Sequence, residues 1–327
     1  MHDRLIECLR IALRHHVTDI HFALDRNDSL KIEMRVRGVI RELKKKEEDG
    51  RFFRYLLYRA NLDVSNTLYP QTGSFEEDVD GTVLSLRFAL ISSYQMTSGV
   101  MRILNNHSLL TVDSLSADPI QTQWLKGITG NRSGLYLISG PTGSGKTTAL
   151  YTVLNETEGK KIFTLEDPIE VYSEHFVQLQ INEKQHMGYA EGIKQLMRHD
   201  PDIILIGEIR DSQAAQMAVR CALTGHLVLS SIHSSGCVNG IERMLELNVS
   251  RNQLSDVLCG ISNQRLYDTS DHRKTGIYEI MDRKETSYYF KNQKTSDQFC
   301  PLAEKIRIAV KNGQIDSRQA EQDIPQQ

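Results

Sequence analysis

Residues 135–148 constrain the fold more than any other stretch, and they read LYLISGPTGSGKTT. The first four are apolar, as expected of a β-strand that is buried on both faces. The pattern G-x-x-x-x-G-K-[ST] follows without a gap at residues 140–147, and apolar residues then recur at helical spacing over residues 149–154. The sequence therefore predicts a strand, a glycine-rich loop and a helix in direct succession.

This loop has the chemistry of a phosphate-binding site, although a chance glycine-rich turn is the alternative. Its glycines let the backbone curl, so that N–H groups and the helix N-terminus form a concave anion site. Lys146 would reach the β- and γ-phosphates, and the Thr147 hydroxyl would be a ligand for Mg²⁺. We therefore expect ATP and Mg²⁺ as cofactors. The residues expected to bind the nucleotide are Gly140, Pro141, Thr142, Gly143, Ser144, Gly145, Lys146, Thr147 and Thr148.

The composition excludes several classes of protein. A chain of 327 residues with 39% hydrophobic and 25% charged residues is long enough for two ordinary globular domains. Its net charge of −3 gives no electrostatic footprint for nucleic acid, and no apolar run approaches the roughly 18–20 residues of a membrane span. Five cysteines without C-x-x-C spacing indicate reduced thiols rather than disulfides or a zinc module, with Cys8 and Cys221 on apolar helix faces.

The first third of the chain is expected to form a compact α+β domain over residues 1–105. Two amphipathic helices and five extended stretches are predicted within it, at residues 3–16 and 52–62 and at residues 19–24, 30–37, 39–43, 82–90 and 99–104. A polar, turn-rich segment follows, so an interdomain linker is expected at residues 106–118.

The remainder alternates strands and helices, which predicts a mostly parallel sheet covered by helices over residues 119–285. Further strands are expected at residues 161–165, 177–181, 203–206 and 227–232, with helices at 122–128, 190–199, 211–224 and 236–247. Asp211 would cap the helix that follows it. Residues 286–327 are expected to form a helical tail whose polar end, after about residue 315, is frayed.

Two acidic positions follow predicted strands. Glu208 comes after the strand 203–206 and Gly207, where an aspartate would be usual, so it would lie at the strand's carboxyl end and orient the attacking water. The alternative is a surface glutamate paired with Arg210. Glu166 ends another strand and is the candidate for holding Mg²⁺ through water, with an acidic loop end as the alternative.

Two histidines, His226 and His233, bracket the strand 227–232. Seven residues apart on a strand, they would point to opposite faces of the sheet, because side chains alternate. One could face the nucleotide while the other faces the sheet or a neighbour, and metal binding by this pair alone is not expected.

Together these stretches resemble the secretion and traffic ATPases of type II secretion and type IV pilus systems. The family's Walker A loop, Asp box, atypical Walker B motif and His box look like residues 140–148, 164–170, 198–211 and 224–234. The N-terminal half matches more loosely, with TDIH at residues 18–21 and RVRG at 35–38, where Arg37 replaces the family's aspartate.

The resemblance implies an α/β protein with a RecA-like motor domain, a smaller PAS-like N-terminal domain and assembly into a ring-shaped homo-hexamer. It implies that Arg87 and Arg102 stabilise phosphate charge, that Arg210 and His233 act in catalysis, and that His226 belongs to the nucleotide site. It also implies a cytoplasmic protein at the inner face of the cell membrane, where it would act on a platform protein of a pilus or pseudopilus.

The function expected from the resemblance is ATP-driven assembly of a competence pseudopilus for DNA uptake. The four-cysteine zinc module of many assembly ATPases does not occur around residues 259–276. A retraction motor with the same chemistry is the first alternative. A RecA-like ATPase acting directly on DNA is the second, but the charge of −3 and the single Trp124 do not favour it. A non-catalytic nucleotide-binding scaffold is the third.

Overall fold

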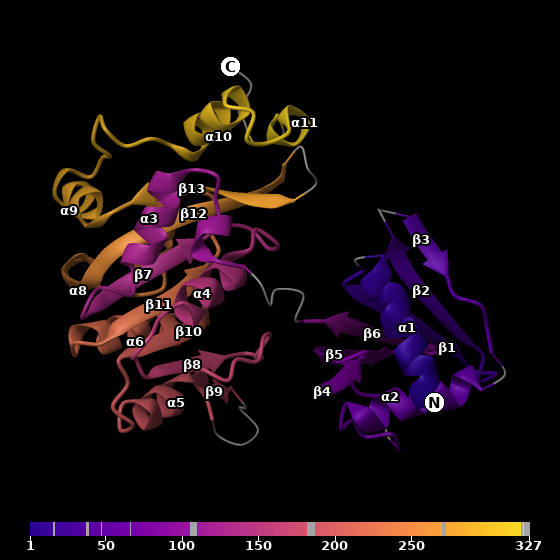
Figure 1. Cartoon of the computed structure of the whole chain (residues 1–327). Helices are drawn as coiled ribbons and strands as arrows, with labels where there is room; N and C mark the ends of the chain where they lie inside the picture. The colour runs from indigo at the N-terminus through magenta and orange to yellow at the C-terminus, as the bar shows by residue number, and fades with distance from the viewer. Residues whose placement is uncertain are drawn as a thin grey trace. The chain divides into compact units, whose positions relative to one another are not determined.

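The computed structural model describes residues 1–15, 17–36, 39–46, 48–65, 67–104, 110–181, 187–269, 273–321 and 323. Two compact units make up the chain: residues 1–108 with 170–172, and residues 109–169 with 173–327. Each unit has its own β-sheet and its own hydrophobic core (Figure 1). We call them the N-terminal unit and the motor unit.

The N-terminal unit is a six-stranded antiparallel sheet in the order β3-β2-β1-β6-β5-β4, with two helices. Its elements are α1 (His2–Arg14), β1 (Asp19–Asp25), β2 (Leu30–Val36), β3 (Val39–Glu42), α2 (Asp49–Arg59), β4 (Gln71–Val79), β5 (Thr82–Ser92) and β6 (Met96–Ile103). Alternate residues of β2 are buried while those between them are more exposed, as the period of a strand requires. The sheet therefore has one face on the core and one polar face.

The sequence prediction missed β4, and the reason lies in its composition. Its sequence, QTGSFEEDV, is largely polar, and only its last positions are buried. β4 lies at the edge of the sheet, where it pairs with β5 and where Arg59 of α2 donates to the Glu77 carboxylate over 2.6 Å. The other predicted elements of this unit are present with small shifts of their ends, while Arg37 lies outside the described residues.

The motor unit has a seven-stranded sheet in the order β13-β12-β7-β11-β10-β8-β9, which is parallel except for the β12–β13 pair (Figure 1). This confirms the predicted mostly parallel sheet. Its elements are η1 (Val112–Ser114), α3 (Pro119–Gly127), β7 (Gly134–Ser139), α4 (Lys146–Asn155), β8 (Ile162–Glu166), β9 (Phe176–Gln180), α5 (Tyr189–Leu196), β10 (Ile203–Ile209), α6 (Ser212–Leu223), β11 (Leu227–Ile232), α7 (Cys237–Glu246), α8 (Arg251–Val257), β12 (Leu258–Asp268), β13 (Lys274–Met281), α9 (Arg283–Asn292), α10 (Leu302–Lys311) and α11 (Ser317–Ala320).

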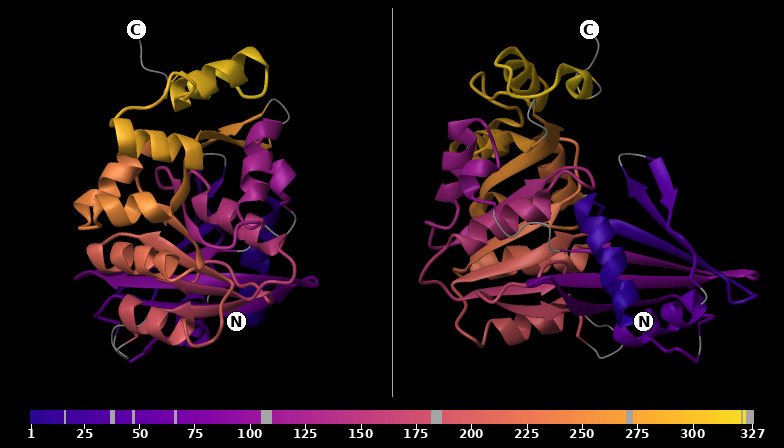
Figure 2. Two further views of the ribbon diagram at one scale, coloured as in Figure 1. Left: turned by 90° about the vertical axis from the view of Figure 1, so that its left-hand side faces the viewer. Right: turned by 45° about the vertical axis from the view of Figure 1, so that its right-hand side comes forward.

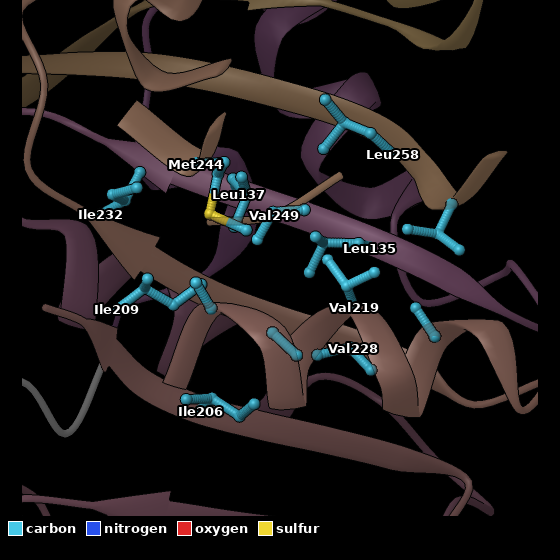
Figure 3. Packing of buried hydrophobic residues seen from close by; sticks show 14 of the residues in the cluster. Leu135, Leu137, Ile206, Ile209, Val219, Val228, Ile232, Met244, Val249 and Leu258 are labelled. Carbon is cyan, nitrogen blue, oxygen red and sulfur yellow. The ribbon is translucent and has the colours of Figure 1, made fainter. Parts of the chain in front are cut away.

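Helices cover both faces of the motor sheet, and the left view of Figure 2 shows the two layers. Helices α5 to α9 contribute to one large core, in which Leu135 and Leu137 of β7 pack with Val219 of α6 and Met244 of α7 (Figure 3). The alternate residue Tyr136 faces the other layer, where its ring meets Trp124 of α3. All six residues of β7 and of β11 are buried, which explains the apolar run 135–138 in β7 and the apolar residues 227–229 in β11.

The segment 110–118 corrects the predicted linker, because it belongs to the motor unit. Val112 is buried, and its backbone N–H donates to the Glu156 carboxylate over 2.8 Å. The Leu115 carbonyl accepts from the N–H of Gly276 over 2.7 Å. These two apolar residues sit within a polar stretch, so composition alone misplaced this boundary. Residues 105–109 of the predicted region lie outside the described residues.

Residues 315–321 are packed where fraying was predicted after about residue 315. Helices α10 and α11 form a small core with Tyr267 and Ile277 of the β12–β13 hairpin, and Ala320 is fully buried within it. The Tyr267 hydroxyl also donates to the Asp323 carboxylate over 2.7 Å. Ile315 and Ala320 both belong to this small core, so the average composition of the segment was misleading.

Both thiols that were predicted to be structural are buried. Desolvation raises the pKa of Cys8 to about 12 and the pKa of Cys221 to about 11, so neither thiol ionises near neutral pH. None of the described helices combines the length and apolar character that crossing a bilayer requires.

Candidate active site

The phosphate loop joins β7 to α4, as the motif predicted. Gly140, Gly143 and Gly145 have φ angles of 149°, 78° and 85°, in the left-handed region that favours glycine. A Cβ at position 140 would lie 2.6 Å from both the Gln264 carbonyl oxygen and Ser144 Oγ. Glycine at position 140 therefore lets the loop lie directly against β12.

Polar groups of the loop point toward its concave side. Lys146 is buried, and its Nζ donates to the carbonyl oxygens of Gly140 and Pro141 over 3.0 Å each. Ser144 Oγ is buried and has no hydrogen-bond partner among the described residues. No side chain caps the N-terminus of α4, where Thr147 and Thr148 lie half-buried in the first turn. These donors fit the phosphates of a nucleotide.

Glu208 lies at the carboxyl end of the motor sheet, although β10 runs to Ile209 rather than ending at the predicted residue 206. The pairing with β11 shifts between Ile206 and Glu208. Arg210 Nε donates to Glu208 Oε2 over 2.6 Å, and His233 Nε2 lies 2.5 Å from Glu208 Oε1. The hydrogen bond to Glu208 raises the pKa of Arg210. The structure thus brings Glu208, Arg210 and His233 together, and the pairing with Arg210 that was the alternative does occur.

Glu166 ends β8 at the same sheet edge and is almost fully buried. Its Oε1 accepts from the hydroxyls of Tyr151 and Thr164, each over 2.6 Å. A Cβ at position 207 would lie only 3.1 Å from Glu166 Cγ, so an aspartate at position 207 would force Glu166 to move. This contact gives a physical reason for Gly207 in β10. Sequence reasoning missed Tyr151 and Thr164; the spacing of Thr164, two residues before Glu166 on one strand, was the available signal.

His226 lies away from these groups, which corrects its predicted place in the nucleotide site of its own chain. It precedes β11, whose first residue pairs with Gly134 and whose last pairs with Ser139, next to the phosphate loop. At about 3.3 Å per residue, roughly 20 Å separate His226 from the loop edge. Its Nδ1 lies 3.1 Å from Thr224 Oγ1 instead. The prediction of a strand between two histidines is confirmed. Only His233 lies at the carboxyl end of that strand, which is the end next to the phosphate loop.

Arg87 and Arg102 stand directly opposite each other on β5 and β6 of the N-terminal sheet. Both project from the polar face, because Leu86, Phe88 and Met101 beside them are buried in the core. The side chain of Arg102 is half-exposed, and its Nε donates to Asp19 Oδ1 over 2.7 Å. Two arginines fifteen positions apart in the sequence therefore form one cationic pair.

These features define the class of protein. A parallel sheet covered by helices carries, at its carboxyl edge, a glycine-rich phosphate loop with a buried lysine and two carboxylates. This is the arrangement of groups that defines an ATP hydrolase.

The chain belongs to the type II/IV secretion system protein family, whose sequence profile matches residues 3–318. It is 35% identical over 256 residues to the competence protein ComGA of Bacillus subtilis (strain 168), covering 77% of this chain and 72% of that protein. It is also 35% identical over 271 residues to the type II secretion system protein E of Klebsiella pneumoniae, covering 80% of this chain. The chain spans about half the length of that relative, 54%.

Among solved structures, the fold is similar to the crystal structure of the pilus retraction motor PilT with bound ADP. The TM-score is 0.75 at 23% sequence identity, and the match covers 98% of this chain and 97% of PilT. The similarity supports the two-sheet α/β fold along the whole chain.

Proposed function

We propose that this ATPase powers assembly of a pilus-like competence pseudopilus used for DNA uptake. The observation that carries the proposal is the convergence of the phosphate loop, Glu166, Glu208 and His233 on one edge of the motor sheet. The similarity to a competence protein over 72% of that protein's length supports the particular role. At residues 258–281, moreover, β12 and β13 pair directly as a hairpin in place of a four-cysteine module.

The phosphate loop would hold the triphosphate, with Lys146 releasing its two carbonyl partners to reach the phosphate oxygens. Thr147, and Glu166 through water, would hold Mg²⁺, which neutralises phosphate charge when bound. Glu208 would orient the attacking water. Arg210 and His233 each lie against one of its two oxygens, and a carboxylate has further lone pairs with which it can accept a hydrogen bond from water.

The N-terminal unit would contribute Arg87 and Arg102, whose planar guanidinium groups suit phosphate oxygens. We propose that they stabilise phosphate charge when the two units close around the nucleotide, as family members do. The motor unit would be RecA-like and would act in a homo-hexameric ring. In the cytoplasm, at the inner face of the membrane, the ring would move a platform protein of the pseudopilus.

A pilus retraction motor is the alternative, since a retraction motor, PilT, is among the structures with a similar fold. Retraction would use the same residues for hydrolysis and differ in the direction of force. Direct action on DNA is less consistent with the net charge of −3. A scaffold without turnover is less consistent with a site that contains candidate groups for each step of hydrolysis.

The role can be tested in the host cell with one variant and one control. A strain whose protein carries Lys146→Ala should lose DNA uptake and surface pseudopili, whereas Lys161→Ala, an exposed surface lysine, should keep both. Loss of pili supports assembly. A strain that instead accumulates more pili and keeps extending them would contradict assembly and support retraction.

A further inference from the structure

The segment that follows His233 is held at both ends by buried side chains from the neighbouring strands. Residues 234–236 lead from β11 into α7. At one end, the Ser234 carbonyl accepts from Asn263 Nδ2 over 3.0 Å. At the other, the backbone N–H of Cys237 donates to Glu279 Oε1 over 2.6 Å. We call residues 233–237 the His loop.

Asn263 of β12 connects the His loop to the phosphate loop. The residue is fully buried, and its Nδ2 also donates to Ser139 Oγ over 2.8 Å. Ser139 is the last residue of β7 and directly precedes Gly140. The Asn263 Oδ1 accepts from Arg265 Nη1 over 3.0 Å, so every polar atom of this buried amide has a partner. The Asn263 side chain thus connects the end of β7, which leads into the phosphate loop, to the His loop.

Glu279 of β13 caps two helices at once. It is buried, and besides Cys237 at the start of α7 it accepts from the N–H of Leu302, at the start of α10, through Oε2 over 2.7 Å. In the part of the chain that the structure describes, no lysine, arginine or histidine pairs with it, so the two N–H groups and helix dipoles compensate its charge. The C-terminal helix α10 is therefore bonded to the same carboxylate as the His loop.

We propose that Asn263 and Glu279 are positioning residues for hydrolysis: they fix the His loop so that His233 Nε2 stays at Glu208 Oε1, and they couple α10 to it. The inference rests on the proposed catalytic roles of Glu208 and His233. Removing the Asn263 amide would leave the part-buried Ser234 carbonyl without this donor, and Ser139 Oγ would keep only its bond to the Ser262 carbonyl over 2.9 Å. The loop would then move relative to the phosphate loop.

The direct test is a double-mutant cycle on kcat with Asn263→Ala, His233→Ala and the combined variant. Asn263→Ala should lower kcat about tenfold or more, as loss of a supporting hydrogen bond commonly does, while leaving affinity for a non-hydrolysable ATP analogue within about twofold. In the His233→Ala background, Asn263→Ala should have almost no further effect on kcat, because the imidazole that Asn263 positions is already absent. Asn292→Ala, which removes only a local bond on exposed α9, is the matched control.

Two outcomes separate the possible failures. If Asn263→Ala costs the same factor with and without His233, or raises the KM for ATP while kcat stays normal, the positioning role is wrong. If His233→Ala alone turns over normally, the catalytic role of His233 fails, and this inference fails with it.

Glu279→Gln keeps the side-chain shape and provides a second variant should Asn263→Ala not fold. An amide offers one acceptor oxygen for two N–H donors, so hydrogen exchange at the Cys237 and Leu302 amides should accelerate together, and kcat should fall with analogue binding retained. Faster exchange at Leu302 alone, with normal kcat, would contradict the coupling between α10 and the His loop.

Discussion

The two sheets of this protein place their functional groups in different ways. The central strands β7, β8 and β11 of the motor sheet are buried along their length, and the carboxylates Glu166 and Glu208 lie at the carboxyl ends of β8 and β10. The N-terminal sheet is antiparallel and buried on one face only, so Arg87 and Arg102 emerge from the middle of its polar face. A parallel sheet concentrates chemistry at an edge, whereas an antiparallel one spreads it over a surface.

This difference has a consequence for the order of the residues in the sequence. Groups at the end of a parallel strand follow that strand directly, so each motif of the motor unit is a continuous stretch. Groups on an antiparallel face meet through cross-strand register, which pairs Arg87 with Arg102 and Arg102 with Asp19. Variants in each unit can test whether the edge of the motor sheet and the polar face of the N-terminal sheet serve one reaction.

The largest effect is expected for Lys146→Ala, which removes the charge buried in the phosphate loop. Turnover should fall on the order of 10³-fold, as when a preorganised donor to developing charge is lost, and nucleotide affinity should fall as well. Steady-state hydrolysis and analogue binding measure both. Lys161→Ala should leave both unchanged, and Lys146→Ala turnover within twofold of wild type would remove the phosphate-site assignment.

Glu208→Gln should separate binding from cleavage. The amide keeps the shape of the side chain but loses the charge that polarises water, so cleavage should slow by about 10²-fold while ATP still binds. Single-turnover cleavage and equilibrium binding on one sample report the two steps. Glu246→Gln, an exposed carboxylate paired with Arg243, is the control. A loss smaller than about twofold would show that Glu208 is only a partner of Arg210.

Phe88→Leu tests whether the two cores are energetically separate. Phe88 is fully buried, and its ring centroid lies 5.7 Å from that of Phe22 and 5.8 Å from that of Phe53. The variant should destabilise the N-terminal unit by about 1–3 kcal/mol and leave the unfolding of the motor unit unchanged. Thermal unfolding with and without a nucleotide analogue can resolve the two transitions. Exposed Ile91→Ala should shift neither, and an equal shift of both would refute separate cores.

The smallest effect concerns acid stability. The hydrogen bond from Lys46, assisted by Arg4, lowers the pKa of Glu7 below its ordinary value of 4.5. A carboxylate with a lowered folded-state pKa stabilises the fold above its unfolded pKa, and this contribution is lost as the pH falls below about 4.5. Because Glu7 is partly exposed, Glu7→Gln should cost less than about 1 kcal/mol at pH 7, and the cost should be smaller at pH 3. Denaturant titrations at the two pH values measure the difference; a constant cost would contradict the ion pair.

Much of the motor unit could be predicted from the sequence because its signals are local. The apolar run before Gly140 and the spacing of the loop predicted β7 and α4, and Asp211 caps α6 through the N–H of Ala214 as expected. Glu208 was correctly placed at a sheet edge because a strand's end is visible in the sequence. The prediction for His226 was wrong because the motif has a histidine at each end of β11, and only the direction of the strand shows which end lies next to the phosphate loop.

The remaining features depend on contacts between distant segments. Nothing near Asn263 or Glu279 in the sequence indicates that they meet the segment after His233, since this contact requires β12 to pair with β7, more than a hundred residues away, and β13 to pair with β12. The polar edge strand β4 and the packed segment at Val112 likewise depend on tertiary partners, so composition gave the wrong answer for both.

The central claim is that Arg87 and Arg102 of the N-terminal sheet serve the hydrolysis whose other proposed groups lie at the edge of the motor sheet. The measurement that tests it most directly is turnover and ATP-analogue affinity of the Arg87→Ala, Arg102→Ala double variant. An Arg10→Ala, Arg54→Ala variant removes two exposed arginines of the same unit and serves as the control. The account predicts analogue binding within about twofold of wild type and turnover reduced on the order of 10³-fold. Normal turnover in the double variant would contradict it.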